Sequence, residues 1–253
     1  MSPDEQHLAL LVGHHEFQRV IGEVDFAYSH LSAARLHRLD LWEPDQLIHL
    51  VLPRSVAERG HRPEVRIHVG RLDPNDRWEI SGLPVTRLEN TLIDCARYVR
   101  RGQAQILMDH GLRLGADRGR LEELVALAGG KRGILTARAA LELGSPLSES
   151  PGESLLLYLV SKMPFPLPTQ QLAVMTRLGR YRIDFGWADI RRGMEFDGKG
   201  KYFKFEPTDE AVFKERQREK AMMEEGWRFL RVEWRDLFRE AELQARIARF
   251  LSS

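Results

Sequence analysis

The order of the elements predicted for residues 153–251 constrains the fold of this chain more than any other feature of its sequence. Hydrophobic periodicity and turn residues predict a helix, three successive strands, a long helix, a further strand and a closing helix. Helices and strands that alternate in this way are typical of an α/β domain. The expected helices span 153–162, 209–225 and 235–251, and the expected strands span 170–176, 180–187, 192–197 and 227–234.

A loop separates this region from the residues before it. The segment ELGSPLSESPGES concentrates Ser, Pro and Gly between two helix-like stretches, RGILTARAALEL and ESLLLYLVSKM. A length of 253 residues allows two domains of ordinary size. We therefore expect an accessory or regulatory domain over residues 1–147 and a second domain over residues 148–253.

The first of these domains is expected to belong to the α+β class. Helical patterns at LSAARLHRL and at TRLENTLIDCARYVRRGQAQILMDHGLRLG bracket two strand-like runs, QLIHLVLPR and EVRIHVGRL. Thr86 and Glu89 match a capping box at the start of the second, longer helix. Both side chains would then satisfy free amide groups of the first helical turn, which is a structural role.

Hydrophobic patterning and cysteine content indicate the class of protein. No apolar run approaches the roughly 20 residues that a membrane helix needs. The N-terminus, MSPDEQHLALLVGHHEF, lacks the pattern of a signal peptide. The single cysteine, Cys95, permits neither an internal disulfide nor a cysteine-built zinc site, and its apolar neighbours predict a packed thiol. We expect a soluble, cytoplasmic protein without membrane contact.

Histidine and charge are distributed unevenly along the chain. All nine histidines precede residue 111, so chemistry in the second domain cannot use imidazole. Because their spacing is not catalytic, we interpret them as ordinary surface or core residues; the alternative is a binding surface. Residues 151–253 carry 19 Lys and Arg against 16 Asp and Glu, an excess that favours polyanionic partners only weakly.

Three carboxylates occupy two neighbouring strands of the second domain. In RYRIDFGW, Ile183 and Phe185 are expected on one side of a strand, which places Asp184 on the other side. In GMEFDG, the same alternation makes Glu195 and Asp197 project together, away from the apolar residues. If the strands pair as a hairpin through ADIRRG, we expect the carboxylates of Asp184 and Glu195 to converge, with Asp197 on the same side.

Carboxylates that lie this close repel one another unless a cation sits between them. Oxygen ligands of this kind suit Mg²⁺ or Mn²⁺, which hold a phosphodiester oxygen and lower the pKa of an attacking water. A single carboxylate on a strand usually belongs only to the solvated face of a half-buried sheet. The combined spacing of Asp184, Glu195 and Asp197 instead predicts a metal site for phosphodiester hydrolysis.

Two lysines follow the third carboxylate immediately. The ammonium group of Lys199 or Lys201 could orient the nucleophilic water or stabilise charge on the phosphorane. The glycines between them let the backbone turn closely, although such Lys/Gly runs are more often plain turns. Lys199 is favoured as the residue nearer to the carboxylates.

Residues 148–238 resemble the Vsr-like endonuclease domains of the PD-(D/E)XK nuclease superfamily. The similarity is carried by SESPGESLL, YRIDFGW, MEFDGKGKY and KERQREKAMMEEGWRFLRVEWRDL. It implies a restriction-endonuclease-like mixed sheet flanked by helices, with a divalent-metal nuclease site on its central hairpin. By this resemblance Asp184 and Glu195 are the first and second acidic ligands. Glu153 matches an acidic residue of the preceding helix that often joins the site.

The motif departs from these relatives at two places. Asp197 stands where the superfamily often has lysine, and Lys201 stands where many Vsr-like relatives have histidine. The resemblance therefore implies a lysine that has migrated to Lys199 or Lys201. It supports the metal ligands better than any particular acid or base.

The first domain has a resemblance of its own. YSHLSAARLHRL and ISGLPVTRLENTLIDCAR are similar to the body of antitoxin-type regulators of abortive-infection toxin–antitoxin systems. The winged helix of those regulators is not expected here, because about 25 residues precede Tyr28. This domain is expected to position a substrate, bind a protein partner or regulate the nuclease.

The patterns and resemblances together predict a metal-dependent endonuclease that hydrolyses DNA phosphodiester bonds in defence or repair. The alternative is a non-catalytic DNA-binding or antitoxin-like regulatory protein that retains a nuclease fold, and the same metal chemistry also permits RNA as substrate. We interpret the basic residues of the long helix as an ordinary solvated face, and three tryptophans as core residues. The basic residues are Lys214, Arg216, Arg218 and Lys220, and the tryptophans are Trp187, Trp227 and Trp234.

Overall fold

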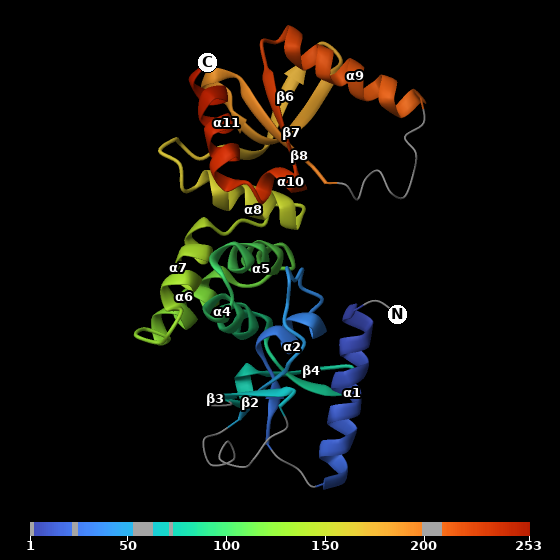
Figure 1. The fold of residues 1–253 in the computed structure, drawn as a ribbon, viewed down its shortest axis with the longest axis vertical. Helices are drawn as coiled ribbons and strands as arrows, with labels where there is room; N and C mark the ends of the chain where they lie inside the picture. Colours follow the sequence, from blue (N-terminus) through green and yellow to red (C-terminus); the bar gives the residue numbers. More distant parts are fainter. Residues whose placement is uncertain (1–2, 22–24, 53–62, 71–72, 199–208) are drawn as a thin grey trace. The chain divides into compact units, whose positions relative to one another are not determined.

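The computed structural model describes residues 3–21, 25–52, 63–70, 73–198 and 209–253 (Figure 1). The contacts of the chain divide it into two compact units, Met1–Pro146 and Leu147–Ser253. Each unit combines helices with a mixed sheet, which confirms the predicted α/β class. Within the described ranges, no helix is both long and apolar enough to span a bilayer.

The N-terminal unit contains a five-stranded sheet with the order β3-β2-β1-β5-β4. β2 is parallel to β3 and antiparallel to β1, while β5 is parallel to β1 and antiparallel to β4. The sequence indicated only β2 and β3, because the other strands have two to four residues and carry almost no periodicity. The bounds are β1 Ala27–Tyr28, β2 Ile48–Leu52, β3 Val65–Val69, β4 Arg77–Ile80 and β5 Leu83–Thr86.

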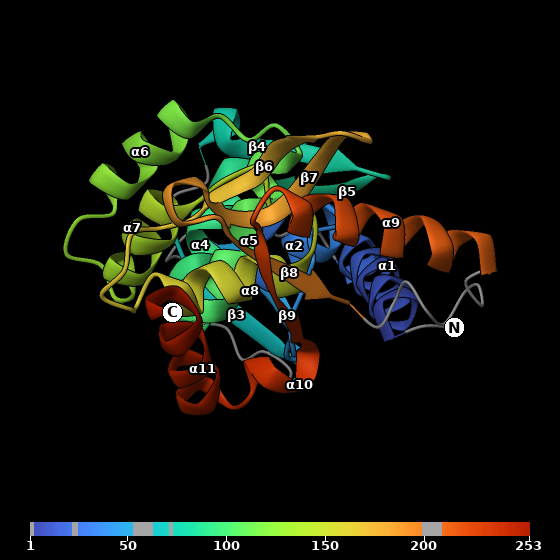
Figure 2. The ribbon, with the colours of Figure 1, turned by 90° about the horizontal axis from the view of Figure 1, so that it is seen from above.

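Helices of this unit lie beside the sheet (Figures 1 and 2), and their side chains also form a second core. Leu11 of α1 packs with Tyr28, Ile48 and Val85 in the core that includes the sheet. The remaining helices surround a separate apolar core, in which Cys95 is free and buried. These helices are α1 Pro3–Ile21, α2 His30–Leu36, α4 Leu88–Tyr98, α5 Arg101–Arg113, α6 Arg118–Leu127 and α7 Ile134–Leu143.

The long helix expected over 86–115 is two helices, and its expected capping box is wrong. The chain becomes extended at Val99, and α5 restarts with the Gln103 side chain accepting a hydrogen bond from the Arg100 amide. At the start of α4 the Thr86 hydroxyl bonds Thr91, whereas Glu89 accepts from the Asp117 amide. Thr86 and Glu89 therefore bond Thr91 and Asp117 instead of forming the capping box that the sequence indicated.

Three histidines of the N-terminal unit stack in its interior. The rings of His30 and His68 lie 3.4 Å apart between centroids and 12° from parallel. His49 joins His68 through ring nitrogens 2.9 Å apart, and its other nitrogen donates to Asp45, 2.9 Å away. Tyr98 donates to the second oxygen of Asp45 at 2.8 Å. The stack thus joins α2, β2, β3 and α4.

The C-terminal unit contains a four-stranded mixed sheet with the order β6-β7-β8-β9. β6, β7 and β8 form an antiparallel meander, and β9 is parallel to β8. All four strands lie within one residue of the ranges expected from the sequence. Their bounds are β6 Thr169–Thr176, β7 Gly179–Trp187, β8 Arg192–Asp197 and β9 Arg228–Glu233.

Helices flank this sheet, as predicted (Figure 1). Met222 of α9 packs with Ile183 of β7 and Trp227, whereas Gly152 of α8 lies against the ring of Phe196 on β8. The closing helix expected over 235–251 is interrupted after Leu237, which makes it two helices. The helices are α8 Pro151–Val160, α9 Asp209–Glu224, α10 Trp234–Leu237 and α11 Glu240–Ser252.

Acidification is expected to open the histidine stack. Burial lowers the pKa of His68 to about 4, and it also lowers the pKa of His30 and His49. The folded state therefore favours neutral imidazole. The stability that these histidines contribute is fully present above about pH 6.5, the ordinary histidine pKa, and is lost as the pH falls toward the folded-state pKa of about 4. Hydrogen exchange measured between pH 7.5 and 4.5 should show the amides of β2 and β3 losing protection as the pH falls.

In His68→Gln the loss of protection with falling pH should be smaller, because one titrating ring of the stack is gone. An equal loss in His68→Gln and the wild type would contradict the role of the stack.

Substitution at Gly152 is expected to weaken the C-terminal unit. An added Cβ would lie 2.0 Å from the Phe196 ring, so Gly152→Ala should lower the free energy of unfolding by about 1–3 kcal/mol. Gly13 of α1 offers a matched control, because a Cβ added there would have no neighbouring atom within 4 Å. Gly13→Ala should raise stability by up to about 1 kcal/mol through helix propensity. Denaturant unfolding of both variants measures the contrast, and equal effects would refute it.

Candidate functional site

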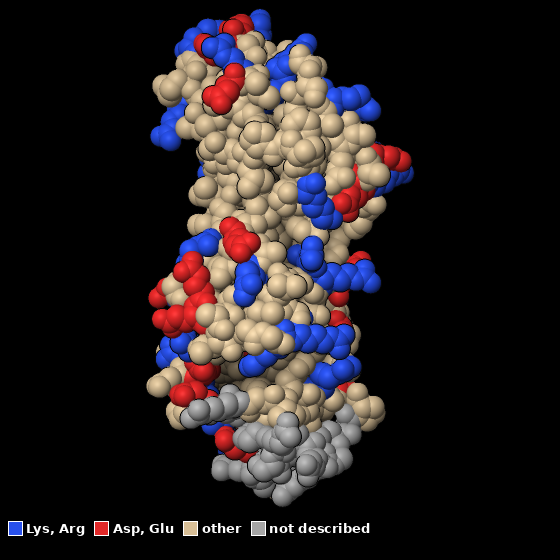
Figure 3. Space-filling view, turned by 90° about the vertical axis from the view of Figure 1, so that its left-hand side faces the viewer, with Lys and Arg blue, Asp and Glu red and all other residues tan. Residues whose placement is uncertain are grey.

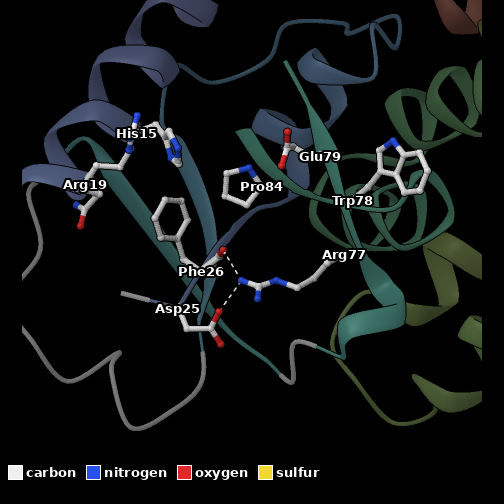
Figure 4. Close-up of a pocket in the computed structure, with 9 residues that line it drawn as sticks. His15, Arg19, Asp25, Phe26, Arg77, Trp78, Glu79 and Pro84 are labelled. Carbon is white, nitrogen blue, oxygen red and sulfur yellow. Dashed lines mark hydrogen bonds and ion pairs between the residues drawn. The ribbon is translucent and has the colours of Figure 1, made fainter. Parts of the chain in front are cut away.

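The N-terminal unit has a pocket of about 560 Å³ between α1 and β4 (Figure 4). The guanidinium of Arg77 points to Asp25 and to the Phe26 carbonyl oxygen, at 2.6 and 2.8 Å. Arg19 and Glu79 add one further charge of each sign to the lining. A pocket with this balance of charges selects neither anions nor cations strongly.

The surface of the N-terminal unit is similarly mixed in charge. Basic and acidic side chains are interspersed on the face of this unit that Figure 3 presents. Interspersed charge gives no extended basic track for a nucleic-acid backbone on that face. The residues that the sequence singled out lie in the C-terminal unit.

Asp184 lies at an interruption of the β6–β7 ladder. The register pairs Gln170 with Phe185 and Leu172 with Ile183, but it omits the positions between them, Gln171 and Asp184. The Asp184 carboxylate accepts a hydrogen bond from the Phe196 amide of β8 at 3.0 Å. It therefore reaches the residue that directly follows Glu195.

Gln171, opposite Asp184, is strained and incompletely bonded. Its φ of 51° is in the left-handed region, which a residue with a long side chain rarely adopts. Its amide nitrogen donates to Glu153 Oε2 at 3.3 Å, while its buried amide oxygen has no hydrogen-bond partner among the described residues. Strain and an unsatisfied polar atom at one residue are features that recur at functional sites.

Glu153, near the start of α8, is buried beside these residues. Its carboxylate accepts from the Glu149 amide at 2.9 Å and from the Ser150 hydroxyl at 2.8 Å. Burial raises the pKa of Glu153, and the negative charges of Asp184 and Glu149 raise it further, while the two hydrogen bonds lower it. The structure thus brings Glu153 close to Asp184.

Glu195 and Asp197 of β8 face arginines. Arg218 of α9 donates to Glu195 at 2.6 Å, and both side chains are largely buried. Arg231, the register neighbour of Glu195 on β9, lies 4.0 Å from Glu195, 3.9 Å from Asp197 and 3.7 Å from Glu219. The two guanidinium groups supply positive charge where the sequence predicted a metal ion.

The predicted metal ligands do not form a coordination cage among the described side chains. No group of three or more His, Cys, Asp or Glu residues in that part of the chain is arranged to hold a metal ion. Lys199 and Lys201 lie outside the described residues, so their place relative to the carboxylates remains a prediction. The oxygen donors of Asp184, Glu153 and Gln171 nevertheless suit a hard divalent cation in chemical type.

The prediction of a wholly solvated basic helix face is wrong for Arg218. Arg216 and Lys220 are exposed, but Arg218 turns inward to Glu195 and to the Arg182 carbonyl oxygen, 3.0 Å away. The side chain of Lys214 is not among those described. Of the three tryptophans, Trp187 and Trp227 are buried, and Trp234 packs edge-on against Phe196.

Sequence reasoning missed Arg218, Arg231 and Gln171. Helical spacing could have found Arg218, because it lies three and four residues before Ala221 and Met222, which are buried on α9. Arg231 meets Glu195 through a parallel pairing between strands separated by a helix, which local patterns do not reveal. A left-handed glutamine on a strand has no sequence signal.

Comparison with known proteins finds relatives without an assigned activity. Uncharacterized protein MT2308 and Uncharacterized protein Rv2248 of Mycobacterium tuberculosis are each 30% identical to this chain over 193 residues. The matched region covers 75% of this chain and 70% of each mycobacterial protein. No family model matches the chain.

The Arg218–Glu195 contact is expected to stabilise the C-terminal unit. Removing one partner of a largely buried, charge-assisted hydrogen bond typically costs about 1–3 kcal/mol, so Arg218→Ala should lower the free energy of unfolding by that amount. Arg231 remains near Glu195 and limits the loss. Arg216→Ala removes the same charge from an exposed position and should change stability by less than about 0.5 kcal/mol. Urea unfolding that gave equal losses for both variants would refute the assignment.

Proposed function

This chain belongs to the same family as the two uncharacterized mycobacterial proteins, and we propose that it is a divalent-metal-dependent endonuclease that hydrolyses DNA phosphodiester bonds. The observation that carries the proposal is the position of Asp184. Its carboxylate bonds the backbone of β8 directly after Glu195, at an interrupted ladder and near the buried Glu153. Irregular strands that gather acidic groups are a frequent setting of active sites.

Asp184, Glu195 and Asp197 are the residues proposed to hold Mg²⁺ or Mn²⁺, with Glu153 beside them. When bound, such an ion polarises a phosphodiester oxygen and lowers the pKa of an attacking water. Binding at Glu195 and Asp197 requires Arg218 and Arg231 to share or yield those carboxylates. The raised pKa of Glu153 lets its carboxyl keep a proton to higher pH than a solvated glutamate does.

Arg218 and one of the two lysines are proposed to contact the phosphate group of the substrate. Arg218 is attached to the surface helix α9, so its guanidinium can approach an anionic oxygen if a cation takes over its contact with Glu195. Lys199 or Lys201 is proposed to orient water or stabilise charge on phosphorus, with Lys199 as the nearer. DNA is the proposed substrate, and RNA is compatible with the same chemistry.

The N-terminal unit, the biological role and the compartment are also proposed. The N-terminal unit is proposed to bind a protein partner, position the substrate or regulate the nuclease. A role in defence or repair in the cytoplasm fits such an enzyme, and the buried, unpaired Cys95 agrees with a reducing compartment.

A second candidate function is a non-catalytic DNA-binding or antitoxin-like regulatory protein that retains the nuclease fold. The observation in its favour is the pairing of Glu195 and Asp197 with arginines, which is typical of a structural ion network. Such a protein would bind DNA equally well with and without a divalent cation.

Cleavage is expected to depend on both a divalent cation and the two strand carboxylates. Asp184→Asn keeps an oxygen for the Phe196 amide, and Glu195→Gln keeps the size of the side chain, so both variants should remain folded. Losing a charged ligand should reduce cleavage by at least about a hundredfold. The measurement is cleavage of single- and double-stranded DNA and RNA with Mg²⁺, Mn²⁺ or chelator.

Asp189→Asn is the matched control, because Asp189 is an exposed carboxylate between the same two strands. It should cleave like the wild type. Full activity in Asp184→Asn would place the nuclease elsewhere or in a contaminant. A wild type that cleaves nothing, yet binds DNA regardless of metal, would establish the regulatory alternative.

A further inference from the structure

Gln171 has three properties that the fold alone does not require. It adopts a φ of 51° inside strand β6, where extended backbone would pair better. Its buried amide oxygen has no hydrogen-bond partner in the part of the chain that the structure describes. It faces, across the ladder, the one position of β7 that carries a predicted metal ligand, Asp184.

The backbone conformation and the buried oxygen of Gln171 both cost folding free energy. A non-glycine residue in this region costs of the order of 1–3 kcal/mol. A buried oxygen without a partner adds a desolvation penalty. The single hydrogen bond from the Gln171 amide nitrogen to Glu153, at 3.3 Å, is long and offsets little of this.

Resting on the proposed nuclease function, we infer that Gln171 is an oxygen donor of the same site and binds the divalent cation together with Asp184 and Glu153. A cation satisfies the buried amide oxygen, and amide oxygens are accepted ligands of hard divalent ions. The amide nitrogen is directed to Glu153, so the oxygen is the atom left for a ligand. The unusual backbone then keeps this side chain within the site.

Metal binding can be measured without substrate by calorimetric titration of the full chain with Mn²⁺. Gln171→Gly removes the amide and accommodates the positive φ, so its melting temperature without metal should equal or exceed that of the wild type. Its Mn²⁺ affinity should fall by about tenfold or more. Gln171→Glu replaces the amide by a carboxylate and should bind Mn²⁺ at least as tightly as the wild type.

Gln170→Ala is the matched control, because the neighbouring glutamine bonds the Ser148 hydroxyl at 2.8 Å rather than Glu153. It should bind Mn²⁺ like the wild type. If Gln171→Gly keeps full affinity while Asp184→Asn loses it, the amide oxygen holds only a water and this inference is overturned alone. If the wild-type chain binds no Mn²⁺, the proposed metal-dependent function falls and the inference falls with it.

Discussion

Partly buried carboxylates of the C-terminal unit need hydrogen bonds or opposite charges in place of water, and this requirement links several of its elements. Moving an ionised carboxylate out of water is costly unless hydrogen bonds or opposite charges replace the lost hydration. Asp184 receives the Phe196 amide, Glu153 receives the Glu149 amide and the Ser150 hydroxyl, and Glu195 receives Arg218. Arg218 thereby ties α9 to β8, and the Phe196 amide ties β8 to β7. The bonds from Glu149 and Ser150 to Glu153 are local to the start of α8.

Much of the C-terminal fold could be predicted because its elements carry local signals. Strand alternation and turn residues located β6 to β9 to within one residue, and they separated Glu195 and Asp197 from the apolar positions of β8. Alternation correctly marked Ile183 as apolar and buried, and it packs in the cluster with Met222. Alternation gave no sign that the β6–β7 ladder is interrupted at the next residue, Asp184. Partners such as Arg231 depend on the parallel β8–β9 pairing, which is a tertiary feature.

The N-terminal unit was less predictable for a related reason. Its sheet includes strands of two and four residues, too short to show periodicity, and these position β2 and β3. The histidines looked scattered in the sequence, since His30, His49 and His68 are far apart along the chain. The parallel pairing of β2 with β3 and the start of α2 bring their rings together. A set of side chains can therefore form one titrating network without any sequence motif.

The charge balance of the candidate site connects its construction to its chemistry. Asp184, Glu195, Asp197 and Glu219 are four carboxylates, and Arg218 and Arg231 are the guanidinium groups that contact members of this set. If all are ionised, these six side chains together carry two negative charges, and Glu153 lies beside Asp184. The described arginine contacts reach Glu195, Asp197 and Glu219. The amide oxygen of Gln171, the residue opposite Asp184, has no hydrogen-bond partner among the described residues. A cation held by Glu195 would have to compete with Arg218 for that carboxylate.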